Sequence, residues 1–156
     1  MRGKKKTPKR KIKPDPKFNN ISVAKFINYI MKRGKKTVAQ TIFYDAMGII
    51  AKETGQEPVE VFETAMKNVG PQLEVRSKRV GGANYQIPFL VRGDRKFSLA
   101  SRWILGAVRS KKGRRMAEKL AEELMLASKN EGTAVKKRED VQRMAEANRA
   151  FAHFAR

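Results

Sequence analysis

The side chains of this sequence that are best placed to do chemistry are cations, and the largest group of them, nearly free of acids, lies in one central segment. Between residues 75 and 117 the sequence holds twelve Lys or Arg residues and a single acid, Asp94. Such cations neutralise phosphates and displace the counterions of a nucleic acid. This segregation of charge gives a directed positive field, which predicts a surface that binds nucleic acid. The twelve are Arg76, Lys78, Arg79, Arg92, Arg95, Lys96, Arg102, Arg109, Lys111, Lys112, Arg114 and Arg115.

Two further groups of cations precede this segment. The first 17 residues contain nine Lys or Arg residues, one acid (Asp15) and three prolines that disfavour a helix. We expect an extended basic arm here that becomes ordered on a polyanion, the alternatives being a solubilising tail or a nuclear targeting signal. The arm's cations are Arg2, Lys4, Lys5, Lys6, Lys9, Arg10, Lys11, Lys13 and Lys17. A short patch around Gly34 adds Lys32, Arg33, Lys35 and Lys36.

A glycine-rich turn interrupts the central segment. Gly81 and Gly82 lack side chains, so the backbone there can approach a sugar–phosphate chain closely. Tyr85 beside the turn could stack on an exposed base or pack one face of a hairpin, and packing is favoured. Trp103, the single tryptophan, could likewise stack on a base or pack in the core, and packing is again favoured. The sequence shows neither a clear helix-turn-helix nor a zipper, so folded RNA suits it better than duplex DNA.

Catalytic chemistry has little support in this sequence. There is no cysteine and only one histidine, His153, which excludes cysteine-ligated zinc and sites built from several histidines. Neither a phosphate-binding loop nor a dinucleotide fingerprint is present. Carboxylates recur at helical spacing, but the pattern favours a solvated helix face over an acid–base pair. They are Asp45, Glu53, Glu57, Glu60 and Glu63. We therefore expect a protein that is not an enzyme and uses no cofactor or metal.

Composition sets the frame for these sites. The chain has 156 residues, 40% of them hydrophobic, so one domain with a real core must coexist with a net charge of +21. That charge repels itself unless a polyanion neutralises it. No apolar run approaches the roughly 20 residues that span a bilayer, and the basic N-terminus lacks the apolar stretch of a secretory signal. We expect a cytoplasmic protein without a membrane partner.

Hydrophobic periodicity predicts the elements that must position the cations. Apolar residues recur at helical spacing over residues 20–31, 35–54, 58–69, 94–109, 116–128 and 133–148. Over residues 72–91 the period changes to two around the glycine turn, which predicts a β-hairpin. The expected fold class is mainly α, a six-helix domain with an inserted basic β-hairpin arm between helices three and four. We expect a basic arm over residues 1–17, one domain over 18–150 and a tail over 151–156.

Local signals predict where the helices begin and end. Asn20 and Thr133 are expected N-caps, and Pro58 suits a first helical position. Gly55 is expected to end the second helix. Two strands alone are marginally stable in water, so the hairpin must rest on the helices or on a partner. The tail from Phe151 carries two aromatic residues and has no clear partner.

Several blocks of this sequence resemble bacterial members of the small-subunit ribosomal protein seven family. The hairpin block is VRSKRVGGANYQIP at residues 75–88. The C-terminal blocks are AVKKREDV at residues 134–141 and MAEANRAFAH at residues 144–153. Shorter matches are FIN at 26–28, IM at 30–31, GKK at 34–36, FYDA at 43–46, LA at 99–100 and RW at 102–103. The resemblance covers roughly residues 18–154, while Gly70, Gln72, Asp94 and the final FAR depart from the family's usual pattern.

The resemblance implies a function that agrees with the charge pattern. It implies a structural constituent of the small ribosomal subunit that binds rRNA of the 3′ major domain and nucleates assembly of the subunit head. It also implies a place at the subunit interface near the exit-site tRNA, beside ribosomal proteins nine and eleven, in a protein that is not a homo-oligomer. The alternative is a free-standing RNA- or DNA-binding regulator.

The site residues expected on this basis fall into three sets. Those expected to bind rRNA are Arg2, Lys4, Lys5, Lys6, Lys9, Arg10, Lys11, Lys32, Arg33, Lys35, Lys36, Arg76, Lys78, Arg92, Arg95, Arg102, Arg109, Lys111, Lys112, Arg114 and Arg115. The hairpin tip expected near tRNA comprises Arg79, Val80, Gly81, Gly82, Ala83, Asn84 and Tyr85. Arg143 and Arg149 are expected to lie near the same tRNA.

Overall fold

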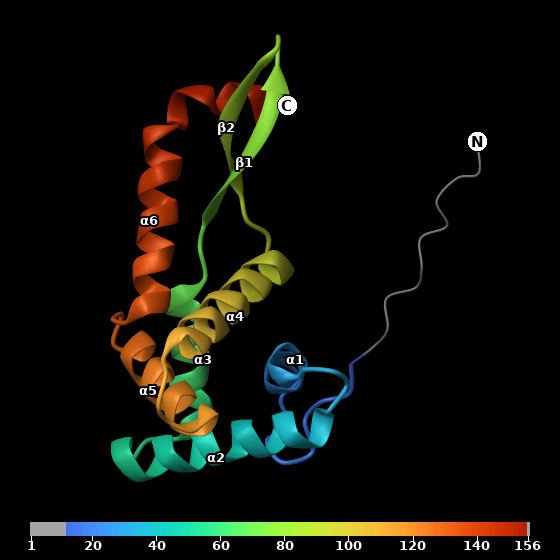
Figure 1. Cartoon of the computed structure of the whole chain (residues 1–156), viewed down its shortest axis with the longest axis vertical. Helices are drawn as coiled ribbons and strands as arrows, with labels where there is room; N and C mark the ends of the chain where they lie inside the picture. Colours follow the sequence, from blue (N-terminus) through green and yellow to red (C-terminus); the bar gives the residue numbers. More distant parts are fainter. Residues whose placement is uncertain (1–11, 156) are drawn as a thin grey trace, which may run out of the picture.

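The computed structural model describes residues 12–155 and confirms the expected fold class (Figure 1). The elements are α1 (Ile21–Ile30), α2 (Lys36–Thr54), α3 (Pro58–Val69), β1 (Leu73–Val80), β2 (Ala83–Leu90), α4 (Gly93–Ser110), α5 (Met116–Ser128), α6 (Thr133–Ala147) and the 3-10 helix η1 (Arg149–Ala155). In Figure 1, α1 to α5 form a base from which the hairpin and α6 extend together. Among the described residues, every helix falls short of the length and apolar character that crossing a membrane requires.

Most helix boundaries follow the local signals. The Asn20 side chain caps α1, its Oδ1 accepting from the backbone N–H of Ser22 at 2.7 Å. Pro58 begins α3, and Gly55 ends α2 in the left-handed conformation with φ 64°. Such a backbone conformation carries no steric cost for glycine.

The N-cap expected at Thr133 is wrong. Thr133 is the first residue of α6, and Gly132, with φ 96°, occupies the N-cap position. Gly132 has no side chain that could accept a hydrogen bond from the first turn. The first turn is satisfied from another helix, because Oε1 of Glu123 in α5 accepts from the N–H of Ala134 at 3.0 Å. The cap of α6 is therefore a tertiary contact that the local sequence does not reveal.

The core of the helical base is built around three phenylalanines. Phe26 in α1, Phe43 in α2 and Phe62 in α3 are each 0% exposed. Their ring centroids lie 5.1 to 5.9 Å apart in tilted or edge-to-face pairs, a geometry that adds to the free energy of burial. Leu120 and Leu124 of α5 complete the same cluster. The apolar stripes that predicted the helices therefore meet in one core.

Asp15 fastens the chain to this core just before α1. Its carboxylate is 3% exposed and accepts from the N–H of Lys17 at 3.0 Å and from the hydroxyl of Tyr44 at 2.8 Å. Burial raises the pKa of Tyr44 to about 12, and the hydrogen bond to Asp15 acts in the same direction. The single acid of the basic N-terminal segment thus ties that segment to α2. The division of the chain at residues 17 and 150 stays a prediction.

The hairpin rests on helices, as its marginal stability required. Its strands pair from Leu73 opposite Leu90 to Val80 opposite Ala83, leaving Gly81 and Gly82 as a two-residue turn with φ 57° and 90°. Positive φ at both central residues matches the right-handed twist of a two-residue hairpin. Helix α6 lies beside β1, and η1 packs across β2 (Figure 1).

We expect Phe43→Ala to lower the free energy of unfolding by about 3–5 kcal/mol, because it opens a cavity in the aromatic core. Urea denaturation measures this loss. Thr41→Ala, at an exposed position of the same helix, serves as the control and should change stability by less than about 0.5 kcal/mol. Equal losses for the two variants would show that α2 does not divide into a buried and a solvated face.

Candidate nucleic-acid interface

The described cations that the sequence assigned to RNA lie on the surface, with one exception. Residues 1–11 lie outside the described part of the chain, so the assignments of Arg2, Lys4, Lys5, Lys6, Lys9, Arg10 and Lys11 stay predictions. The exposed members are Lys32, Arg33, Lys35, Lys36, Arg76, Lys78, Arg79, Arg92, Arg95, Arg102, Arg109, Lys112, Arg114, Arg115, Arg143 and Arg149. Lys111 is the exception and is discussed below.

A buried acid organises the cations at the base of the hairpin. Glu74 of β1 is 6% exposed, and its carboxylate accepts from Arg76 on the same strand and from Nε of Arg95 in α4 at 3.0 Å. Burial by itself raises the pKa of Glu74, but the hydrogen bonds and charges of the two arginines lower it overall. The side chains of Arg76 and Arg95 keep 57% and 45% of their surface exposed. Glu74 therefore holds two guanidinium groups in place while leaving them accessible to phosphates.

Lys111 has a structural partner that the sequence analysis missed. Its ammonium lies 3.1 Å from Oε2 of Glu123, which is 0% exposed, and 3.3 Å from Oε1 of Glu122. Burial by itself lowers the pKa of Lys111, but these carboxylates raise it overall. Because Glu123 also caps α6, one side chain joins the α4–α5 loop, α5 and the start of α6. A signal for this role was present, since Glu123 occupies a position of the stripe formed by Leu120, Leu124 and Ala127.

The basic loop between α1 and α2 meets a cation of α4 that is distant in the sequence. Lys32, Arg33, Lys35 and Lys36 follow α1 and are exposed around a turn where Arg33 and Gly34 have φ 53° and 74°. Arg109, near the end of α4, donates from Nη2 to the carbonyl of Ile30 at 3.5 Å. Arg109 at the end of α4 therefore lies beside Lys32 and Lys35 of the α1–α2 loop, and the three cations form one basic region. The sequence could not reveal this, because 70 residues separate the two groups.

The C-terminal 3-10 helix is the partner of the hairpin's outer half. The ring of Tyr85 lies 5.1 Å from that of Phe151 and 5.3 Å from that of Phe154, measured between centroids. Nζ of Lys78 donates to the carbonyl of Phe154 at 2.8 Å. This confirms the packing role favoured for Tyr85 and gives the aromatic tail a partner. Trp103 is likewise partly buried against the core, as favoured.

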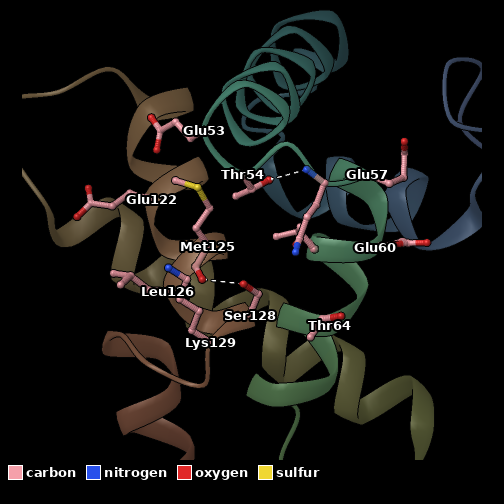
Figure 2. A pocket seen from close by; sticks show the side chains of 12 residues that line it. Glu53, Thr54, Glu57, Glu60, Thr64, Glu122, Met125, Leu126, Ser128 and Lys129 are labelled. Atoms are coloured by element: carbon pink, nitrogen blue, oxygen red, sulfur yellow. Dashed lines mark hydrogen bonds between the residues drawn. The ribbon is translucent and has the colours of Figure 1, made fainter.

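Three of the five carboxylates considered as catalytic candidates, Glu53, Glu57 and Glu60, line an open groove between α2, α3 and α5. The groove encloses about 900 Å³, and Figure 2 shows Glu53, Glu57, Glu60 and Glu122 spread around it rather than paired. Among the described residues there is no group of three acidic, histidine or cysteine side chains that could hold a metal ion. The carboxylates of α2 and α3 are exposed, as a solvated helix face requires. Charge is thus segregated in space as well as in sequence.

Comparisons with known proteins point to one family. The chain matches the family described as ribosomal protein S7p/S5e over residues 2–149. It is 57% identical to the small ribosomal subunit protein uS7 of Thermotoga maritima over 151 residues, which cover 97% of each chain. It is 59% identical to the protein of the same name from Thermosipho melanesiensis, with 93% and 94% of the two chains covered. The uS7 protein of Nitrosomonas europaea is 53% identical, with 99% of each chain covered.

We expect Glu123→Ala to lower the free energy of unfolding by about 3–5 kcal/mol, because it leaves the Lys111 ammonium without its buried partner and α6 without its cap. Glu122→Ala is the matched control. Glu122 faces the same lysine at 3.3 Å, but its side chain is 41% exposed, so its loss should cost about 1 kcal/mol or less. Chemical denaturation of both variants tests this, and comparable losses would contradict a central role for Glu123.

Proposed function

The chain belongs to the ribosomal protein S7p/S5e family, and we propose that it binds rRNA of the 3′ major domain directly and nucleates assembly of the subunit head. It is a structural constituent of the small ribosomal subunit and not an enzyme. The observation that supports direct rRNA binding is the exposure of its cations along the hairpin, α4 and the two basic loops. The relatives described above are all named as small ribosomal subunit proteins, which does not support the alternative of a free-standing regulator.

The binding mode that we propose is recognition of RNA shape by fixed cations. Arg76 and Arg95 are held by Glu74, so less side-chain entropy is lost when they meet a phosphate. Lys112 and Arg115 lie in the loop between α4 and α5, where both are exposed. Contacts of this kind fix the register of the protein on a folded RNA without reading its bases.

We further propose that the hairpin tip lies near the exit-site tRNA, with ribosomal proteins nine and eleven as neighbours. Arg79, Gly81, Gly82 and Asn84 are exposed at the tip. In Figure 1 the tip projects away from the base formed by α1 to α5, and η1 is the helix that lies nearest to it. Arg149 begins η1 and lines a groove together with Pro88 and Leu90 of β2, so this expected C-terminal cation lies beside the hairpin.

We expect rRNA binding to depend steeply on salt, because each phosphate contact releases counterions. If about eight side chains contact phosphates, log K should fall against log salt with a slope between roughly −5 and −7. Filter binding of the full chain to a transcript of the 3′ major domain measures the slope. A slope near zero would be incompatible with binding through phosphates.

We expect the tip to be dispensable for assembly and required for tRNA handling. Lys78 lies opposite Tyr85 in the register, so residues 79–84 can be removed and replaced by a two-residue turn without disturbing the remaining pairs. Tyr85 and its contacts with η1 are retained. Subunits with the shortened protein should assemble but show altered tRNA retention or more reading-frame errors.

The control for this experiment is Arg79→Ala, which removes the cation of the tip and keeps its length. Subunit profiles and frameshift reporters are measured in parallel for both proteins. Failure of the subunit head to assemble with the shortened hairpin would make the tip an assembly element instead.

A further inference from the structure

An apolar groove lies at the centre of the basic region formed by the α1–α2 loop and the end of α4. It encloses about 250 Å³, and its lining surface is mostly apolar. Val38, Ile42 and Met116 contribute to its floor, and Lys32, Lys35 and Arg109 contribute its cations. We refer to it as the α1–α2 groove. No carboxylate is among the described residues that line it.

The floor of this groove is an exception on a highly charged surface. Val38 is 52% exposed, one of few large apolar side chains in the described chain with so much surface in water. Ile42 and Met116 are partly buried and pack against the core, which fixes the floor from below. An exposed apolar surface within a ring of cations fits a ligand that is apolar at one end and anionic at the other.

The cations are held at the edge of the groove by the backbone. The N–H of Lys35 donates to the carbonyl of Lys32 at 3.1 Å, closing the turn that places both lysines beside the groove. The Arg109 guanidinium is tied to the carbonyl of Ile30 at 3.5 Å. Three positive charges, two from the α1–α2 loop and one from the end of α4, therefore lie around one apolar floor.

We propose that the α1–α2 groove binds an unpaired RNA nucleotide, with the base on the apolar floor and the flanking phosphates on Lys32, Lys35 and Arg109. This inference rests on the proposed rRNA binding, and it names a ligand for one part of that surface. Unpaired bases are the part of a folded RNA that can leave the stack and contact apolar side chains. The floor residues Val38, Ile42 and Met116 have no side-chain nitrogen or oxygen, so the site should accept different bases.

The test uses the full chain and a transcript of the 3′ major domain, with base-specific chemical probing. The wild-type protein should protect one unpaired base, and Val38→Ala should restore its reactivity while the remaining protections persist. Affinity should fall about fivefold, at the low end of the loss of one base contact. The salt slope should not change, whereas Lys35→Ala should make it shallower by about 0.7 to 0.9.

A matched pair of variants separates loss of the groove from a change of net charge. Val38→Glu and Ile21→Glu each add one carboxylate at a side chain that is 52% exposed. Ile21, at the start of α1, is not among the residues that line the groove. Val38→Glu should abolish the base protection and weaken binding at least tenfold, and Ile21→Glu should do neither. Equal melting temperatures for the wild type and Val38→Ala check the fold.

Each other outcome has a distinct meaning. If the wild type binds and Val38→Ala keeps every protection and full affinity, the groove does not hold a base. If the Val38 variants keep the RNA footprint but impair the joining of another small-subunit protein, the groove holds a protein side chain, and the inference is wrong. If the wild type itself fails to bind the transcript, the proposed function is overturned together with this inference.

Discussion

The mutual repulsion of the cations is the constraint on which the rest of this structure depends. A chain of 156 residues with a net charge of +21 must bring like charges close together when it folds. The apolar core around Phe26, Phe43 and Phe62 opposes that repulsion. Two buried acids offset part of this repulsion, because Glu74 lies between Arg76 and Arg95, and Glu123 pairs with Lys111. Four further acids, Glu53, Glu57, Glu60 and Glu122, line the groove of α2, α3 and α5 instead of diluting the basic surface.

The same contacts transmit rigidity from the helical base to the hairpin. Glu123 fixes the first turn of α6 by accepting a hydrogen bond from Ala134. Helix α6 packs beside β1, and η1, which follows α6, packs on β2 in the outer half of the hairpin. There the ring of Tyr85 packs against the rings of Phe151 and Phe154. Two strands with a two-residue turn would be marginal alone. The chain therefore supports its most extended element at both ends, with Glu74 at the base and aromatic packing near the tip.

Sequence periodicity predicted the elements because helices and hairpins carry local signals. It placed the hairpin between the third and fourth helices, and Asn20 and Gly55 mark helix ends as expected. It failed where a residue's partner comes from another element that is distant in the sequence. Thr133 was expected to cap α6, but the carboxylate of Glu123 in α5 accepts the hydrogen bond from the first turn of α6 instead. Lys111 resembled its exposed neighbours, yet a buried carboxylate engages it. Gly70 leaves room for Lys96, since a Cβ there would lie 2.6 Å from Cε of that lysine.

The cations therefore divide by their surroundings rather than by their residue type. Lys111 lies against a buried carboxylate and holds the fold together, so its charge is largely satisfied before any RNA arrives. Arg76 and Arg95 share Glu74 and still expose about half of their surface, so they are oriented for a ligand. Exposed residues such as Arg102 and Arg115 remain in water until a polyanion approaches. Because RNA also relieves the repulsion among these charges, binding should stabilise the fold by favouring the compact state. The charge that makes folding difficult for the isolated chain is thus the property that couples its folding to its partner.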